Sequence, residues 1–98
     1  MYYKNVIRNF RSKALEQLFH GQPKLIEASL RRKVENILLT LSAATSIEAM
    51  NLPGFRLHEL KGNRKGTWAV TVRANWRITF RFENGHAADV DFEDYHGD

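Results

Sequence analysis

The sequence predicts an α+β domain in which two N-terminal helices pack on a mostly antiparallel sheet of four to five strands. Two periodicities predict it. In the first half of the chain, apolar residues recur every three or four positions, as on one face of an amphipathic helix. After Gly54, apolar and polar residues alternate instead, as in strands with one buried face. The length of 98 residues fits one domain, so we expect residues 1–98 to form a single unit.

The helical half of the chain contains two long patterns and a shorter one. Residues 10–19 predict a first helix, which Gly21 and Pro23 end. The TSIE motif at residues 45–48 matches a capping box and predicts one further short helical turn. Residues 2–10 alternate loosely and predict a short first strand. From Pro23 onward, an apolar stripe predicts a second helix of roughly five turns; its members are Ile26, Leu30, Val34, Ile37, Leu38 and Leu41.

Four strands are predicted after Gly54, over residues 55–60, 67–72, 76–82 and 86–92. The loop KGNRKG joins the first two, and the Asn84-Gly85 signal predicts a tight turn between the last two. Alternate residues of these strands are expected to face the helices, namely Trp68, Val70, Val72, Trp76, Ile78, Phe80, Phe82, Ala88, Val90 and Phe92. The opposite face of the sheet, which carries Arg77, Thr79 and Arg81, is expected to be uncovered.

The composition excludes several classes of protein. There is no cysteine, which rules out a disulfide framework and a thiolate zinc site. No stretch approaches the roughly 20 apolar residues that span a bilayer, and the first ten residues are too polar for a secretory signal. We therefore expect a cytoplasmic protein with no membrane partner.

Charged residues are distributed unevenly along the chain. Residues 1–82 contain all 15 Lys and Arg against five acids, a net charge of +10, whereas the last sixteen residues contain six acids and no Lys or Arg. Such a basic body attracts polyanions, including nucleic acid. A solvated surface or an acidic protein partner explains the charge equally well. On the uncovered sheet face, Arg77 and Arg81 are also expected to pair with Asp89 or Asp91 on the neighbouring strand.

The chain ends in FEDYHGD, which sets Asp94, Tyr95 and His96 directly after the last predicted strand. A twisted meander can bring these residues close to His58 on its first strand. Two imidazoles and a carboxylate suit cleavage of a phosphodiester, because an imidazole with a pKa of about 6.5 both accepts and donates protons at neutral pH. RNA supplies its own 2′-hydroxyl nucleophile, so such a site needs no metal and no cofactor. Cations that can stabilise the phosphoryl oxygens are expected nearby, at Lys61, Arg64, Lys65, Arg73 and Arg77.

Each of these residues also has a purely structural interpretation. His58 alone suits a surface or hydrogen-bonded histidine, Asp94 a turn cap, and Tyr95 an anchor that packs its ring. A metal site of His58, Asp94 and His96 is a further alternative. The surrounding cations argue against it, because they repel a divalent ion.

Three strings, FRLHELKGNRKGTW, VRANWRITF and VDFEDYH, resemble the HigB group of the RelE/ParE toxin superfamily, the toxins of bacterial type II toxin–antitoxin pairs. The resemblance extends to NFRSKALEQLF near the start and to LSAATSIEAMNLPG, so it covers nearly the whole chain. It implies the RelE-like fold and a ribosome-dependent mRNA endonuclease that cuts translated message and arrests protein synthesis. It also implies a HigA-like antitoxin with a helix-turn-helix domain, through which the complex contacts operator DNA.

The resemblance also implies roles for individual residues. The family's acidic and imidazole positions fall on His58, Asp94, Tyr95 and His96, and its RNA contacts fall on Lys61, Asn75, Arg77 and, less directly, Arg73. The residues themselves do not say which group donates and which accepts the proton. ParE-type toxins of the same superfamily act on DNA gyrase and lack this cluster. A gyrase inhibitor without nuclease activity, or a co-repressor that acts only with its antitoxin, are therefore the alternatives.

Overall fold

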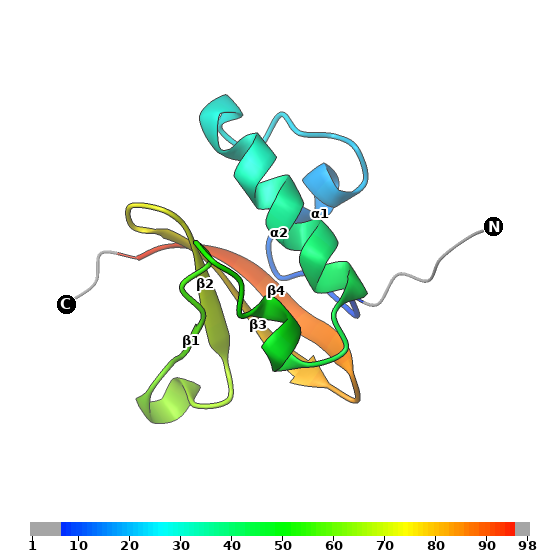
Figure 1. Cartoon of the computed structure of the whole chain (residues 1–98). Helices are drawn as coiled ribbons and strands as arrows, with labels where there is room; N and C mark the ends of the chain where they lie inside the picture. The colour runs from blue at the N-terminus through cyan, green and yellow to red at the C-terminus, as the bar shows by residue number, and fades with distance from the viewer. Residues whose placement is uncertain (1–6, 96–98) are drawn as a thin grey trace.

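A computed structural model describes residues 7–95 of the chain, which form two layers (Figure 1). One layer is an antiparallel sheet in the order β1-β2-β3-β4. The helices α1 (Lys13–Phe19) and α2 (Arg31–Ala43) lie together on one of its faces. The strands are β1 (His58–Glu59), β2 (Trp68–Arg73), β3 (Trp76–Glu83) and β4 (His86–Asp94). This arrangement confirms the predicted α+β class, with a sheet of four strands within residues 7–95.

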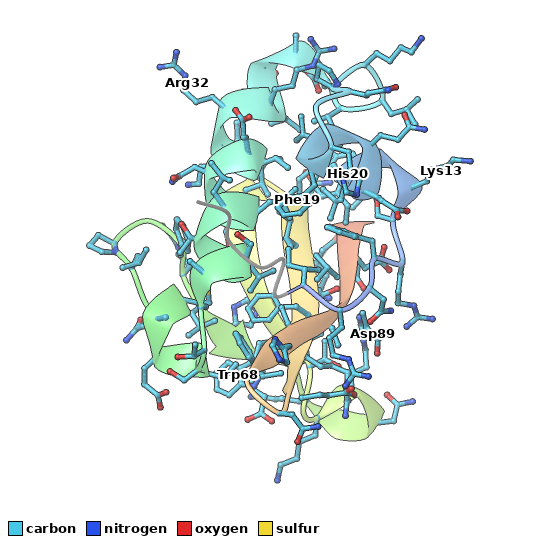
Figure 2. All side chains as sticks on the ribbon, turned by 90° about the vertical axis from the view of Figure 1, so that its right-hand side faces the viewer. Lys13, Phe19, His20, Arg32, Trp68 and Asp89 are labelled. Carbon is cyan, nitrogen blue, oxygen red and sulfur yellow. The ribbon has the colours of Figure 1, made fainter. Side chains whose placement is uncertain are left out.

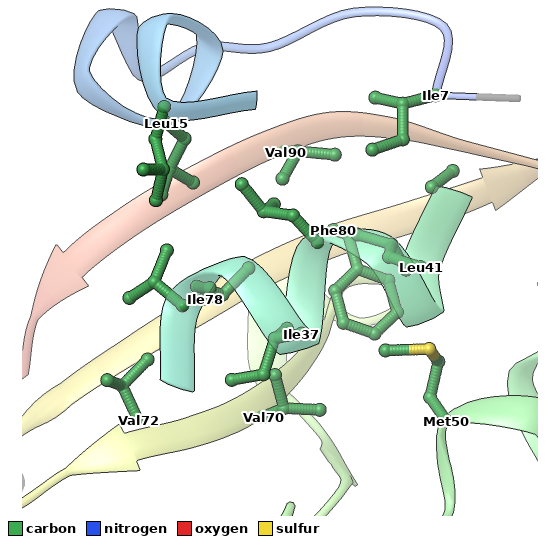
Figure 3. Close-up of a cluster of buried hydrophobic side chains, with 14 of the residues drawn as sticks. Ile7, Leu15, Ile37, Leu41, Met50, Val70, Val72, Ile78, Phe80 and Val90 are labelled. Atoms are coloured by element: carbon green, nitrogen blue, oxygen red, sulfur yellow. The ribbon is translucent and has the colours of Figure 1, made fainter. Parts of the chain in front are cut away.

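The hydrophobic core lies between the helices and the inner face of the sheet (Figure 3). Phe80 and Ile78 on β3 are fully buried against Ile37 and Leu41 of α2 and Leu15 of α1. α1 forms within the predicted range 10–19 but begins only at Lys13, because Ser12 caps it by accepting a hydrogen bond from the backbone N–H of Leu15 at 3.2 Å. The helical layer is therefore held on the sheet by the apolar stripes that the sequence displays.

The second helix is shorter than predicted at its N-terminal end. α2 begins at Arg31, after a 3-10 turn over Ala28–Leu30, and residues 23–27 form turns instead of helix. The backbone N–H of Ile26 donates to the carbonyl of Pro23 at 3.0 Å, and Nε of Arg31 donates to the carbonyl of Ile26 at 2.8 Å. Ile26 and Leu30 are nevertheless buried. The apolar stripe thus reports which side chains are buried, and it was wrong as a measure of helix length.

The capping box predicted at residues 45–48 does not form. A short turn is present, as a 3-10 helix over Ile47–Met50 that Ser46 precedes. The Ser46 side chain makes no capping hydrogen bond to any part of the chain that the structure describes. The helical turn was predicted correctly, and its buried anchor is Met50.

The predicted first strand lies partly outside the described residues. Its described end forms isolated parallel bridges to β4, from Ile7 to Ala87 and from Phe10 to Val90. The backbone N–H of Arg8 donates to the carbonyl of Ala87 at 2.7 Å. The segment therefore lies along the edge of β4 and covers it, as edge strands in soluble proteins need.

β1 is also shorter than the predicted strand over residues 55–60. Arg56 has a φ of +53°, which breaks the extended conformation. The segment still runs along β2, because Phe55 accepts a hydrogen bond from the backbone N–H of Thr71 and Leu60 donates one to Thr67, both at 2.8 Å. The strand was therefore predicted in the right place, with an interruption directly before His58.

β4 contains a bulge that the sequence did not indicate. The Asn84-Gly85 turn forms as predicted, with a positive φ at both residues. Asp89 has a φ of +53°, and the register of β3 against β4 shifts by one residue between Thr79 and Arg81. Ala88 lies opposite Arg81 on the face away from the helices, so its predicted inward orientation was wrong, although the residue is only 2% exposed. Beyond the bulge, Val90 and Phe92 pack with the core as predicted.

The face of the sheet opposite the helices, here called the outer face, is covered in part. Thr79 and Arg77 lie on this face with exposed fractions of only 2% and 9%. The expectation of an uncovered face was therefore wrong. Its cover comes from the end of β4 and from the loop between β1 and β2, whose contacts with Arg77 build the candidate site.

Candidate active site

A cleft of about 540 Å³ opens on the outer face of the sheet, between the β1–β2 loop and the end of β4. His58 comes from β1, Arg77 from β3, and Tyr95 directly follows β4. The register explains why Tyr95 lies near Arg77: Arg77 pairs with Glu93 across β3 and β4, and Tyr95 follows Glu93 by two residues. The residues that line the cleft are His58, Glu59, Leu60, Lys61, Arg64, Arg77 and Tyr95. Five of the ten residues proposed from sequence thus share one cleft.

His58 lies at the rim of the cleft with a defined ring orientation. Its Nδ1 is 3.0 Å from the carbonyl oxygen of Arg56, two residues earlier. A carbonyl oxygen accepts only, so Nδ1 carries the proton of this hydrogen bond. In the neutral imidazole, Nε2 then has an unshared pair and is able to accept a proton. The positive φ of Arg56 places its carbonyl oxygen where it accepts the hydrogen bond that stabilises this tautomer of His58.

Glu93 links the two guanidiniums of the cleft and was not among the residues proposed from sequence. Its Oε1 accepts from Nε of Arg77 at 3.0 Å and from Nη1 of Arg64 at 3.2 Å, and it forms an ion pair with Nη2 of Arg77 at 2.9 Å. Its Oε2 accepts from Nη2 of Arg64 at 2.5 Å. The hydrogen bonds from Arg64 and then from Arg77 hold the pKa of Glu93 below its usual range. The same contact raises the pKa of Arg64, so Arg64 and Glu93 both stay charged.

Arg77 is enclosed between this carboxylate and an aromatic ring. Its guanidinium carbon lies 3.9 Å from the centre of the Tyr95 ring, a cation–π contact. The backbone N–H of Tyr95 donates to the carbonyl of Asn75 in the β2–β3 turn. These two contacts hold the chain in the cleft up to the residue before His96. His96 itself lies outside the described residues.

Asp94 and Asn75 form a separate pair beside the cleft. The side-chain amide of Asn75 donates to Oδ1 of Asp94. Asp94 pairs with Trp76 across the sheet, so its side chain points to the face opposite that of Glu93. Within residues 7–95, the cleft lining does not include Asp94. The pair fixes the β2–β3 turn against the end of β4, and its part in catalysis stays a prediction.

Two other residues proposed as RNA contacts lie elsewhere. Nη2 of Arg73 donates to the hydroxyl of Ser29 at 2.9 Å and lies 3.8 Å from the carboxylate of Glu27, on the segment before α2. Lys65 is exposed at the far end of the β1–β2 loop. Neither is part of the cleft lining as far as the described residues go.

Basic side chains on the helices lie apart from this site. Figure 2 shows Lys13 on α1 and Arg32 on α2 pointing away from the body of the molecule. Arg31 is instead held by the carbonyl of Ile26, and Lys33 by the carbonyl of Gly54 at 3.3 Å. Positive surface on α2 is therefore centred on Arg32.

The described part of the chain contains neither a group of metal ligands nor a membrane-spanning helix. In residues 7–95, no three His, Asp or Glu side chains are grouped so that they could hold a metal ion. None of the helices in this part of the chain has the length and apolar character that crossing a bilayer requires.

Comparison with known proteins identifies the family. The model of the RelE-like toxin HigB of type II toxin–antitoxin systems matches residues 8–96. The chain belongs to this HigB-like toxin family. It is 42% identical over 92 residues to "Endoribonuclease HigB" of Proteus vulgaris, a match that covers 93% of this chain and all of the relative. It is 32% identical over 88 residues to "Toxin HigB-1" of Vibrio cholerae serotype O1, covering 83% of this chain and 88% of the relative.

Membership of the HigB-like family confirms the resemblance drawn from the sequence strings, and the two-layer structure fits the RelE-like fold. A toxin of a type II pair has a protein antitoxin as its partner, so an antitoxin is implied for this chain. The matched residues 8–96 include the whole cleft lining and the DYH string.

Proposed function

We propose that this HigB-like toxin is an endoribonuclease that cuts messenger RNA on the translating ribosome and so arrests protein synthesis. The observation that supports it most is the cleft in which His58 and Lys61, Arg77, and Tyr95 meet from three separate parts of the chain. One relative is itself named an endoribonuclease. The cleft combines a proton acceptor, fixed cations and an exposed aromatic ring, which are the groups that RNA cleavage requires.

The proposed reaction uses the 2′-hydroxyl of the RNA as nucleophile. The 2′-oxygen attacks the adjacent phosphorus while its proton passes to Nε2 of His58. The bond from phosphorus to the 5′-oxygen breaks, and the leaving oxygen takes a proton from His96. The products are a 2′,3′-cyclic phosphate and a free 5′-hydroxyl. All atoms come from the RNA and two imidazoles, so the step needs neither metal nor cofactor.

Cations of the cleft stabilise the charge that develops on the phosphoryl oxygens. Lys61 is exposed at the start of the β1–β2 loop and is able to reach a phosphate from the solvent side. Arg77 is rigid because Glu93 and Tyr95 hold it, so it costs little reorganisation when the transition state forms. Tyr95, with 41% of its surface exposed, offers a ring face on which a base can stack.

The residues at the edge of the cleft are proposed to support these groups. Asn75 holds both Asp94, through its side chain, and Tyr95, through its carbonyl. Arg64 contributes positive charge beside Arg77, whereas Lys65 and Arg73 act at a distance, on RNA that extends beyond the cleft.

The proposed partners are a HigA-like antitoxin, the ribosome and its message. Operator DNA would be contacted through the helix-turn-helix domain of the antitoxin, and the site of action would be the cytoplasm. The excess of Lys and Arg over acids in residues 1–82 supports binding to a surface of ribosomal RNA.

Primer extension on message with and without translating ribosomes tests this function. Purified protein is added to both samples, and the 5′ ends are mapped. Cuts confined to the translating sample are expected. Intact message in both samples, together with DNA-damage signalling in cells that express the protein, would instead favour a gyrase inhibitor. Harmless expression without cutting would favour a co-repressor that acts with its antitoxin.

A further inference from the structure

We infer that Glu93 is a positioning residue of the cleft, which holds the guanidiniums of Arg64 and Arg77 at a fixed separation for contact with an RNA phosphate. This inference rests on the proposed function, because it assigns a role within the same site. It adds a residue that sequence patterns did not indicate and that does not itself need to touch RNA.

The geometry of the contact supports positioning over simple charge pairing. Arg64 meets Glu93 in a two-point fork, Nη1 to Oε1 and Nη2 to Oε2. Arg77 approaches the same Oε1 through Nε and Nη2. Two-point contacts restrict rotation of a planar guanidinium, whereas a single contact leaves it free to swing. One carboxylate thus orients both cations.

Burial makes the arrangement rigid. The side chains of Arg77 and Glu93 are 11% and 23% exposed, while Arg64 is 43% exposed at the end of the β1–β2 loop. A loop residue with that exposure would normally sample many rotamers. Glu93 therefore ties the β1–β2 loop, which also carries Lys61 into the cleft, to the sheet.

The net positive charge of Arg64, Arg77 and Glu93 together favours binding of an anion. Two guanidiniums and one carboxylate carry a net charge of +1, and Lys61 stands on the same cleft. A carboxylate and a phosphate both accept hydrogen bonds from guanidinium forks. Glu93 thus keeps the donors in an anion-binding arrangement before RNA arrives, which lowers the reorganisation needed in the transition state.

Replacement of Glu93 by Gln separates positioning from binding. Glu93→Gln keeps the size of the side chain and removes the charge. We expect kcat for cleavage on the ribosome to fall by roughly 10- to 100-fold, because the guanidiniums lose their fixed orientation. RNA affinity should be unchanged or higher, since the cleft gains one positive charge. In wild type, the side-chain Nε–H NMR signals of Arg64 and Arg77 should be sharp, and in Glu93→Gln they should broaden.

Glu83→Gln is the matched control. Glu83 also bridges two arginines, Arg8 at 3.4 Å and Arg81 at 3.8 Å, but it lies at the other end of β3. Its replacement should leave kcat and RNA affinity unchanged. Glu93→Asp keeps the charge with a shorter reach, and its kcat should fall between wild type and Glu93→Gln. This second variant tests the inference even if Glu93→Gln folds poorly.

The outcomes separate this inference from the proposed function. If wild type cuts message and folded Glu93→Gln cuts with the same kcat, the positioning role is overturned and the nuclease stands. A kcat and an RNA affinity that fall together, in step with a lower melting temperature, would also overturn it, because that pattern marks a merely structural residue. Absence of cutting by wild type would instead overturn the proposed function.

Discussion

The guanidinium of Arg77 stacks on the ring of Tyr95, with 3.9 Å between the guanidinium carbon and the ring centre. This contact joins the middle of the sheet to the residue that precedes His96. It explains how Tyr95, which follows the last strand, becomes part of the cleft, because Tyr95 is also held through its backbone N–H by Asn75. The opposite wall of the cleft comes from His58 and Lys61.

The Tyr95 ring should matter more than its hydroxyl for holding Arg77. Tyr95→Ala removes the ring face and should lower the stability of the protein by about 1 kcal/mol, the size of a partly exposed cation–π contact. Tyr95→Phe keeps the ring and should change stability by less than about half of that. Urea unfolding of both variants measures the difference. Equal losses in the two variants would show that the hydroxyl, not the stack, carries the contact.

Lys61 and Lys65 form a natural pair for testing the cleft. Both are exposed lysines of the β1–β2 loop, but Lys61 lines the cleft and Lys65 does not. Lys61→Ala should lower kcat/KM for message cleavage by roughly 10- to 100-fold, as loss of a cation near the developing charge does. Lys65→Ala should change it by less than about threefold, the scale of a screened surface charge. A larger effect at Lys65 than at Lys61 would show that the RNA binds mainly outside the cleft.

Ala74 in the β2–β3 turn should be a strained position. Its φ of +50° lies in the left-handed region, which costs a side chain with a Cβ about 1–2 kcal/mol. Glycine adopts this conformation without that cost, so Ala74→Gly should stabilise the protein by about 0.5–1 kcal/mol. Ala43→Gly, at the exposed end of α2, should instead destabilise it by a similar amount. Thermal unfolding measures both. Destabilisation at both positions would mean that the turn is unstrained.

The ion pairs of Glu93 predict a loss of stability in acid. Because its pKa is lowered in the folded state, the carboxylate stabilises the fold above the ordinary glutamate pKa of 4.5. This contribution declines as the pH falls below 4.5 toward the folded-state pKa, since protonation breaks the contacts with Arg64 and Arg77. Urea midpoints between pH 7 and pH 3 should therefore fall more steeply for wild type than for Glu93→Gln. Parallel curves would show that the pair contributes nothing to stability.

The sequence predicted the fold class and five of the seven residues that line the cleft, because those depend on local pattern. Apolar periodicity marked the buried side chains correctly, including Ile26, although the backbone there is not a helix. The strings around His58 and Tyr95 indicated residues that the structure does bring together. Local pattern therefore indicated which residues are buried or line the cleft better than it indicated backbone conformation.

Glu93 was missed because its partner depends on a bulge. Counted back from the Asn84-Gly85 turn without interruption, Arg77 would lie opposite Phe92. The extra residue at Asp89 shifts the register, so that Arg77 meets Glu93 instead. A positive φ at a non-glycine residue leaves no clear mark in sequence. The same reason explains the interruption of β1 at Arg56. The bulge also separates Ala88, which lies opposite Arg81, from Val90 and Phe92, which face the core.

The chemistry at the cut ends tests the central claim most directly. Message cut on translating ribosomes by wild type should carry a 2′,3′-cyclic phosphate upstream and a 5′-hydroxyl downstream, identified by mass spectrometry of the fragments. His58→Gln and His96→Gln, checked for folding by circular dichroism, should each lower the cutting rate by at least about 100-fold, the lower end of the range for a general acid or base. Fragments with a 3′-hydroxyl and a 5′-phosphate, or a folded His58→Gln protein that cuts at the wild-type rate, would contradict the account.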